Sequence, residues 1–360
     1  MIQKKRAIVF GLFLGVLLIL PGVAAQAQNP TLLKRTISVT ARRWSRYWKN
    51  PKAAEPQYNT WCWTPQVKFQ ILGPVTDGSQ FQVEIALPDG RPWMTLDMRT
   101  RELQDDYLDE IKMVDVDDDT MERRAILTPA GLFPFKIILK NELQGTNNVM
   151  FAGKFKVGTY TPNQAIPEFK GKQEFYVDHD WMLPVGYIWL DPQIDENVPA
   201  LSALMTFRGQ DELSEMTGYL YYNGKKIAEA RGNDKDERSN STGEKNSVYY
   251  NWQFTFATVR GFNKDTSANN YSSIFLLDKN PGAYEIKVLT KGELTRTLAF
   301  SVGTDGKITD NGIAKNNKIG GVRFIVPVKI IAEAAPNWDK TAWQNGAFYG
   351  NPLAGFTALP

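Results

Sequence analysis

The sequence predicts an all-β protein made of two tandem β-sandwiches, and three observations lead to this fold class. Apolar and polar residues alternate over 80–87 and over 250–256, as they do in a strand with one buried face. An Asn-Gly dipeptide at 223–224 separates two further strand-like runs and favours the two-residue turn of a hairpin. A similar hairpin pattern ends two blocks of domain size, at 129–158 and at 281–303, which indicates an internal duplication.

Residues 1–27 have the three parts of a secretory signal peptide in order. A positive stretch at 4–6 precedes an apolar run at 7–20, and a small-x-small cleavage site follows at 25–27. An uncleaved membrane anchor is the alternative. A helix needs about 20 apolar residues to span a bilayer, and this apolar run is shorter. We therefore expect a signal peptide and an exported protein, located in the periplasm or at the surface of a bacterial cell.

Charge and cysteine content narrow the classes of partner. The chain has 42 Lys+Arg and 39 Asp+Glu, and loss of the signal peptide removes the positive residues at 4–6, so the mature chain is near neutral. This balance argues against nucleic acid as a partner. Cys62 is the one cysteine in the sequence, so no disulfide can form within the chain. Because it lies between Trp61 and Trp63, we expect a buried thiol, with an intermolecular bridge as the alternative.

Residues 28–57 form a basic arm whose charged residues are all positive up to residue 52. At helical spacing the apolar residues from Leu33 to Trp48 fall on one face, which predicts an amphipathic segment. Such a segment could contact anionic lipid or an anionic polymer of the envelope. The alternative is a helix packed on the first sandwich, with its arginines partly balanced by the acids at 105–119. The candidate contact residues are Arg42, Arg43, Trp44, Arg46 and Trp48.

The rest of the chain divides by its strand patterns and its proline content. Pro162 and Pro167 have the spacing of an extended connector, which indicates a linker. One strand is predicted at 322–330, and Pro327 favours a place at a sheet edge for it. The expected organisation is a first sandwich at 58–160, a linker at 161–174, a second sandwich at 175–303 and a partly irregular tail at 304–360.

The hairpin at 281–303 resembles part of a known fold. Its first residues, 281–286, resemble the turn and the start of the penultimate strand in immunoglobulin-like and fibronectin-III-like sandwiches. In those families an aromatic residue at this corner bonds back to the main chain, and Tyr284 stands at that position. The copy at 129–158 has Phe133 in the equivalent place. The resemblance implies two immunoglobulin-like β-sandwiches without an inter-sheet disulfide, and it implies no activity.

Acidic residues gather at 105–119 and raise the question of a calcium site. Counted from Asp115, carboxylates fall on alternate positions, as in a calcium-binding loop. Thr120 stands where an EF-hand requires glycine and Ile126 where it requires glutamate, so an EF-hand is excluded. An irregular calcium site and a solvated acidic loop are the two remaining alternatives, and no other cofactor is expected. The candidate calcium ligands are Asp115, Asp117 and Asp119.

Residue counts disfavour most catalytic classes. His179 is the one histidine, which excludes zinc sites built on several His or Cys residues, and no Gly-x-Ser-x-Gly motif is present. A pair of carboxylates could still hydrolyse glycosides. Aromatic rings can also stack on sugars, and Tyr219 and Tyr221 share one face of a predicted strand.

The sequence thus favours an exported, non-catalytic binding or structural module of the bacterial envelope that acts through protein–protein contacts. A carbohydrate-binding module is the alternative, with Tyr219 and Tyr221 as its ligand-binding residues, and a carboxylate-based glycoside hydrolase has less support. The expected partner is an envelope protein or polysaccharide. Peripheral membrane contact through residues 28–57 is a further expectation.

Overall fold

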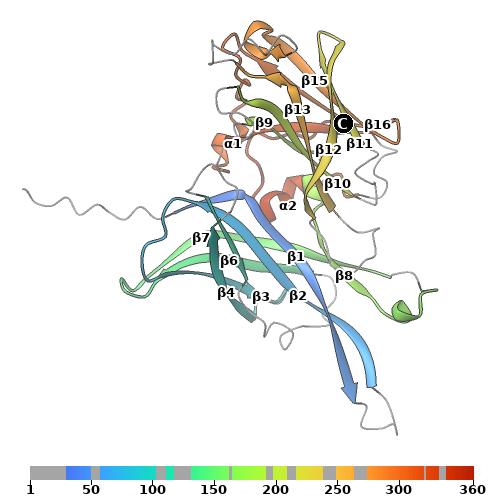
Figure 1. Cartoon of the computed structure of the whole chain (residues 1–360). Helices are drawn as coiled ribbons and strands as arrows, with labels where there is room; N and C mark the ends of the chain where they lie inside the picture. Colours follow the sequence, from blue (N-terminus) through green and yellow to red (C-terminus); the bar gives the residue numbers. More distant parts are fainter. Residues whose placement is uncertain are drawn as a thin grey trace, which may run out of the picture.

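A computed structural model shows two curved β-sheets that lie one above the other, with the C-terminal residues between them (Figure 1). The predicted signal peptide lies outside the part of the chain that the structure describes. The structure describes residues 30–49, 57–102, 111–116, 131–161, 164–191, 198–208, 216–237, 249–262, 274–319, 322–331 and 338–360.

The first sheet has eight strands, all paired antiparallel in the order β1-β2-β5-β4-β3-β6-β7-β8. A short 3-10 helix, η2 (Pro167–Phe169), lies between β7 and β8. The strands are β1 (Thr31–Lys49), β2 (Gln57–Leu72), β3 (Ser79–Ala86), β4 (Pro92–Glu102), β5 (Ile111–Val116), β6 (Gly131–Asn141), β7 (Thr146–Tyr160) and β8 (Glu174–Asp178).

The second sheet follows the 3-10 helix η3 (Asp180–Met182) and has nine strands. Its strands are β9 (Val185–Asp191), β10 (Ala200–Arg208), β11 (Met216–Tyr222), β12 (Lys225–Glu237), β13 (Tyr249–Arg260), β14 (Phe275–Leu276), β15 (Gly282–Thr290), β16 (Glu293–Val302) and β17 (Phe324–Ile330). Its helices, and those that follow it, are η6 (Leu277–Lys279), α1 (Ile313–Asn316) and α2 (Ala342–Gly350).

The two sheets repeat one strand order. Apart from the short parallel strand β14, the pairings of the second sheet run β9-β10-β13-β12-β11-β15-β16-β17, which is the order of β1 to β8 in the first sheet. The two hairpins that indicated a duplication are β6–β7 and β15–β16. Each holds a stacked aromatic pair at the same place: Phe133 and Phe155 are 5.4 Å apart, and Tyr284 and Phe300 are 5.3 Å apart. The chain therefore contains two copies of one β-unit.

The two copies differ in how they close. In the second, β17 pairs with β9 and β10 pairs with β13, so the pairings return to their starting strand and form a barrel-like circuit. In the first, β1 and β8 are the edge strands of the sheet, and side chains connect them. The all-β prediction is confirmed, whereas the structure does not confirm immunoglobulin-like sandwiches. The corner bond that the resemblance implied is present, because the Tyr284 hydroxyl donates to the Asn280 carbonyl oxygen.

The basic arm is a strand, and the prediction of a helical apolar face was wrong. Residues 31–49 pair with β2 as β1, and Ile37, Val39 and Ala41 are buried on its inner face. Residues four apart lie on one face of a helix and also on one face of a strand, so this part of the pattern suited both. The partner strand decided between them, because β2 pairs with one edge of β1 over residues 31–33 and 38–49.

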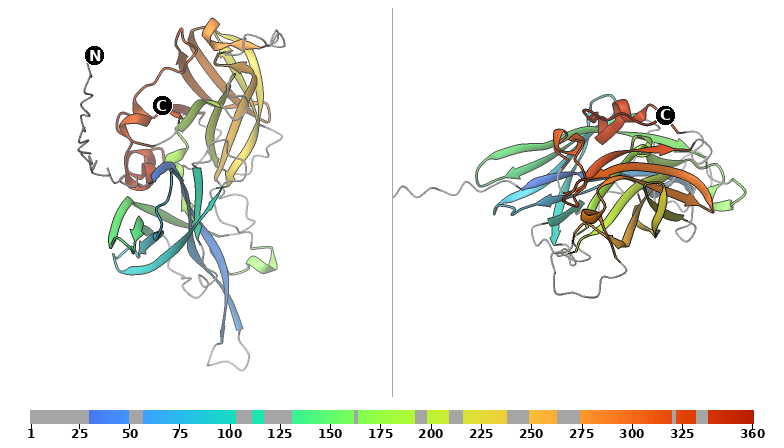
Figure 2. Two further views of the ribbon diagram at one scale, coloured as in Figure 1. Left: turned by 60° about the vertical axis from the view of Figure 1, so that its left-hand side comes forward. Right: turned by 90° about the horizontal axis from the view of Figure 1, so that it is seen from above.

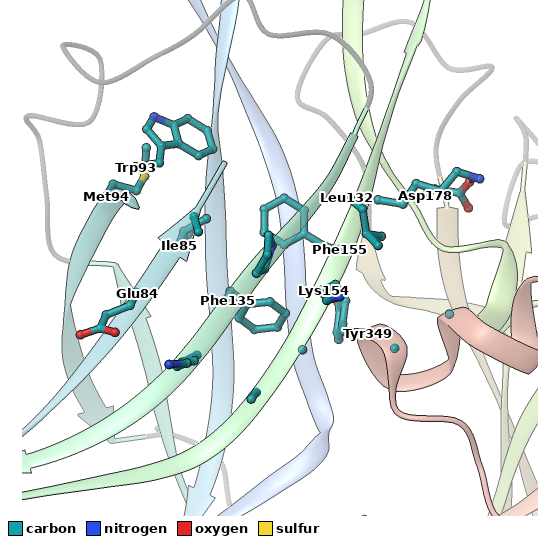
Figure 3. A pocket seen from close by; sticks show the side chains of 18 of the residues that line it. Glu84, Ile85, Trp93, Met94, Leu132, Phe135, Lys154, Phe155, Asp178 and Tyr349 are labelled. Carbon is teal, nitrogen blue, oxygen red and sulfur yellow. Dashed lines mark ion pairs between the residues drawn. The ribbon is translucent and has the colours of Figure 1, made fainter. Parts of the chain in front are cut away.

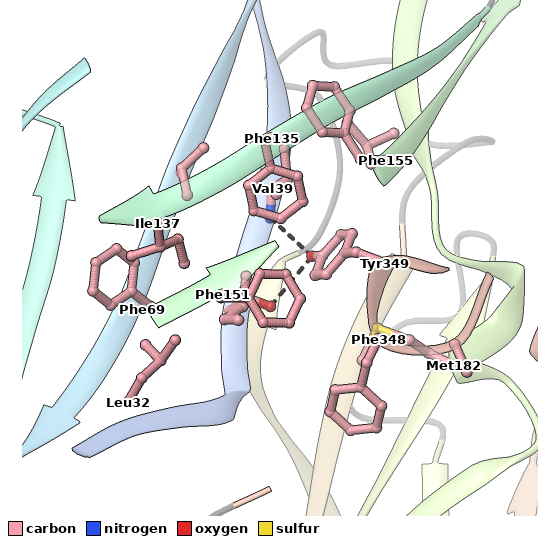
Figure 4. Close-up of a cluster of buried hydrophobic side chains, with 14 of the residues drawn as sticks. Leu32, Val39, Phe69, Phe135, Ile137, Phe151, Phe155, Met182, Phe348 and Tyr349 are labelled. Atoms are coloured by element: carbon pink, nitrogen blue, oxygen red, sulfur yellow. Dashed lines mark hydrogen bonds between the residues drawn. The ribbon is translucent and has the colours of Figure 1, made fainter. Parts of the chain in front are cut away.

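The observed boundaries of the two units also differ from the predicted ones. The start of the predicted second sandwich, together with Glu174 at the end of the predicted linker, supplies β8 to the first sheet, and the predicted tail supplies β17 to the second. The last residues, 338–360, return to the first unit (Figure 2). There Phe348 and Tyr349 join a buried cluster beside Phe135 (Figure 4). Phe356 and Trp63 belong to the same cluster.

The end of α2 has an unfavourable backbone. Phe348 and Tyr349 have φ angles of 43° and 57°, in the left-handed region that bulky residues avoid. Each costs about 1–2 kcal/mol relative to a right-handed conformation. Packing and hydrogen bonds in the first unit must offset this cost, which makes the docking of residues 338–360 a strained arrangement.

Candidate functional site

A groove of about 1300 Å³ lies on the first unit (Figure 3). It lies over β3, β4, β6 and β7. We call it the outer groove because Glu84, Lys136 and Lys154 in its lining are exposed. Residues of the C-terminal segment, 339–350, form one wall. Gly153 of β7 allows this close approach, since a Cβ atom there would lie 2.8 Å from the Tyr349 carbonyl oxygen.

Charged side chains of both signs line the outer groove in cross-strand rows. Glu84 lies between Thr95 and Lys136 in the strand register. Lys156 forms a 2.9 Å ion pair with Asp178 on β8, and this bond raises the pKa of the Lys156 ammonium above its usual 10.5. These rows fix several of the charged groups in place, although exposed pairs of this kind add little stability.

The central part of the outer groove combines cations with apolar surface. Within the described residues, Lys136 and Lys154 form no salt bridge, and both are exposed. Pro134 is the cross-strand neighbour of Lys154, and the adjacent Leu132 is 48% exposed. An exposed leucine beside unpaired ammonium groups is suited to a ligand with both apolar and anionic groups.

A buried polar cluster, here called the junction cluster, lies beside the groove where the two units meet. The Asp180 carboxylate accepts hydrogen bonds from the Tyr249 hydroxyl at 2.8 Å and from the Asp339 main-chain N–H at 2.8 Å. Arg208 forms an ion pair with it at 3.2 Å. Through the one carboxylate of Asp180, the cluster therefore joins η3 to strands β10 and β13 of the second unit and to the C-terminal segment.

Burial controls the ionisation of the junction cluster. It raises the pKa of the Asp180 carboxyl above its usual 3.8, and the negative charge of Asp178 adds to this rise. It also raises the pKa of the Tyr249 phenol well above 10.0, with further contributions from Asp178 and Asp180. Sequence patterns missed this cluster because its members are far apart in the chain; the one local indication was the acid-rich stretch around His179.

Tyr249 should make the protein sensitive to alkali. Its pKa is higher in the folded state, so the unfolded chain ionises first as pH rises above about 10, and stability is lost from there up to the folded-state pKa. We expect Tyr249→Phe to make the fall in unfolding free energy between pH 9.5 and 11.5 shallower, by up to about 1.4 kcal/mol per pH unit. Tyr284→Phe should act similarly, because burial also raises the pKa of Tyr284. Urea unfolding across this pH range measures the slope, and an unchanged slope in Tyr249→Phe would contradict the assignment.

The structure separates the predicted sugar-binding tyrosines from the outer groove. Tyr219 and Tyr221 are half-buried on the outer face of β11, in the second unit. Lys226 lies 4.7 Å from the centre of the Tyr219 ring, and Lys287 lies 4.7 Å from that of Tyr221. Each ring thus already holds a cation against one of its faces.

The described arm residues make contacts within the first unit. Arg43 forms a 2.9 Å ion pair with Glu174 and lies 4.1 Å from the centre of the Trp61 ring. The Trp44 indole donates to the Thr64 hydroxyl at 2.8 Å, and exposed Arg42 lies over the Trp44 ring. The side chains of Arg46 and Trp48 lie outside the described residues. The buried thiol expected at Cys62 is confirmed, and it donates to the Trp44 carbonyl oxygen.

The predicted calcium ligands fall mainly outside the description. Asp115 lies on β5, where the structure describes the main chain only, and Asp117 and Asp119 lie beyond the described residues. In the part of the chain that is described, no group of three His, Cys, Asp or Glu residues could hold a metal ion. His179 is buried, and its Nε2 lies 3.1 Å from the Val39 carbonyl oxygen.

Comparisons with known proteins assign no family. No family model matches the chain, and no curated protein matches it. One solved structure that was found is an uncharacterized protein from Listeria monocytogenes in complex with glucose, magnesium and calcium. It is 12% identical with a TM-score of 0.19, and the match covers 70% of this chain and 20% of that protein. Among the described residues, no helix is long and apolar enough to cross a membrane.

Proposed function

We propose that the protein is an exported binding module that holds a segment of another envelope protein in the outer groove. The observation that carries this proposal is the groove itself, whose floor of sheet surface presents exposed Leu132 beside the cations of Lys136 and Lys154. The pattern at residues 1–27 supports export. Mixed apolar and charged surface of this kind is typical of contacts between proteins that also exist apart.

A hydrolase has less support from the same groove. Three of its carboxylates hold neighbouring groups: Asp97 accepts from Gln82, Asp178 pairs with Lys156, and Asp339 accepts from Thr341. A general acid and its partner need freedom to exchange protons with a substrate. Carbohydrate binding at Tyr219 and Tyr221 also has less support, because bound lysines compete for the ring faces that a sugar would use.

A photo-crosslinking experiment tests the proposal. A photoreactive amino acid at position 132 of the exported chain should link to a discrete envelope protein in intact cells. The matched control places it at position 143, because Leu143 is 79% exposed but lies on the turn between β6 and β7, outside the groove lining. Equal crosslinking from both positions, or none from position 132, would count against a protein partner in the groove.

A charge reversal measures the contribution of the groove cations. We expect Lys154→Glu to lower the crosslinked yield at position 132 about fivefold to tenfold, because losing a central contact commonly costs more than about 1 kcal/mol. Lys225→Glu, in the turn region of the second unit, is the control of equal charge change and should leave the yield unchanged. If both variants reduce the yield equally, the effect is one of total charge and not of the groove.

A further inference from the structure

Among its described residues, the first unit has no counterpart of the strand pairing that closes the second. In the second unit β17 pairs with β9 from Phe324 to Pro327. The equivalent strand of the first unit, β8, ends at Asp178, where the chain turns into η3. In the second unit β17 pairs with the outer edge of β9. In the part of the chain that the structure describes, no strand pairs with the corresponding edge of β1.

Side chains satisfy the main chain of β1 along this edge. The Tyr349 hydroxyl accepts a hydrogen bond from the Val39 N–H at 3.0 Å and donates to the Ile37 carbonyl oxygen at 3.2 Å (Figure 4). The His179 imidazole, as an Nε2–H donor, bonds the Val39 carbonyl oxygen at 3.1 Å. One tyrosine hydroxyl thus occupies both a donor and an acceptor that a neighbouring strand would use.

Buried aromatic side chains and directional hydrogen bonds hold the residues that cap this edge, and these contacts must offset a strained backbone. Phe348 and Tyr349 both have left-handed φ angles. Asn351 donates to the Ala152 carbonyl oxygen at 3.1 Å, and Ala354 donates its N–H to Asn317 at 2.8 Å. A strained cap is easier to displace than a relaxed one, since release of the strain offsets part of the lost contacts.

We propose that the β1 edge at residues 37–39 is a strand-binding edge, that residues 338–360 cap it in this structure, and that its partner is an extended protein segment. The segment pairs antiparallel with β1 through main-chain hydrogen bonds, as β17 does with β9. This site is distinct from the floor of the outer groove, but the same C-terminal residues form one wall of that groove, so displacing the cap would also open the groove.

The surroundings of Tyr349 define the chemistry of the partner. Its ring lies 5.5 Å from that of Phe135 and 5.8 Å from that of Trp181, in a buried aromatic cluster. A segment that displaces the cap must fill this space, so it carries an aromatic or large aliphatic residue between its main-chain bonds. A polar segment of the same length would leave a buried cavity and is excluded as a partner.

A peptide of residues 322–331 is the probe, because it contains the strand that occupies the equivalent edge of the second unit. With residues 28–360, we expect this peptide to bind and to slow hydrogen exchange at the Val39 amide. Tyr349→Phe removes both hydroxyl bonds to β1 and keeps the ring, so it should raise the peptide affinity about threefold to tenfold. Without peptide, it should speed exchange at the Val39 amide by a similar factor.

Tyr284→Phe is the matched control, because it removes a tyrosine-to-main-chain bond in the second unit, and its peptide affinity should equal that of the unchanged chain. The same peptide N-methylated at positions 325 and 326 keeps its side chains and should not bind, since two consecutive main-chain donors, one of which faces the edge, are removed and replaced by methyl groups. Equal binding of the methylated peptide, or unchanged exchange at Val39 in saturating peptide, would overturn the proposal. The exchange measurement on the unchanged chain decides the matter even where Tyr349→Phe does not fold. A concentration-dependent dimer that protects Val39 without peptide would assign the edge to a second copy of the chain and would also overturn it.

Discussion

Asp180→Ala is expected to lower the free energy of unfolding by about 3–5 kcal/mol, the usual cost of removing one partner from a buried ion pair. The substitution leaves Arg208 and the Tyr249 hydroxyl without the carboxylate that they share. It also removes the acceptor of the Asp339 N–H and so loosens the C-terminal segment. Urea unfolding followed by circular dichroism measures the change.

The control is Asp305→Ala, which removes an exposed carboxylate and its turn hydrogen bond from the Lys307 N–H, and which should lower the free energy of unfolding by less than about 1 kcal/mol. Asp180→Asn keeps the shape of the side chain and should fall between the two, because an amide oxygen can still accept a hydrogen bond. A loss below about 1 kcal/mol in Asp180→Ala would mean that the junction cluster does not hold the two units together.

Trp63→Ala is expected to cost about 3–5 kcal/mol through the cavity that it leaves in the first unit. The Trp63 side chain has no exposed surface, and its ring lies 5.1 Å from that of Phe133 and 5.2 Å from that of Trp93. The ring of Phe175, on the edge strand β8, lies 6.1 Å from that of Trp63, so the cavity would extend to this edge of the sheet. Calorimetry of the variant should show a lowered transition temperature for the first unit.

Trp252→Ala supplies the matched comparison, because Trp252 is equally buried in the separate cluster of the second unit. Each variant should lower mainly the transition of the unit in which its own ring lies, although the cluster around Trp63 also includes Tyr187, Trp189 and Ile325 of the second unit and so links the two transitions. Identical melting curves for both variants would show that the two units unfold as one.

Local patterns in the sequence predicted the individual strands well. The alternation at 80–87 corresponds to β3, and that at 250–256 lies within β13. The Asn-Gly turn joins β11 to β12, with φ angles of 48° at Asn223 and 76° at Gly224. These features depend on neighbouring residues only, so the sequence specifies them directly.

The arrangement of the strands could not be read in the same way. The second sheet closes because β9 pairs with β17. These strands are far apart in the chain, and nothing in the local sequence of either strand identifies the other as its partner. The outer groove likewise combines four strands with the C-terminal residues. Tyr349 lies in the tail for which the sequence predicts only partly irregular structure, and its position follows from packing in the first unit and from a left-handed φ angle that no tyrosine favours.

The hydrogen bond between Val39 and Tyr349 joins residues separated by 310 positions. Because synthesis runs from the N-terminus, Val39 of β1 is made 310 residues before Tyr349, and the edge of β1 stays uncovered until Tyr349 has been added. Contacts of such long range are slow to form, because the intervening chain must be ordered first. An open edge during this delay is a site for unwanted pairing between nascent chains. The fold of the first unit is therefore complete only when residues 338–360 have been made and have covered the edge of β1.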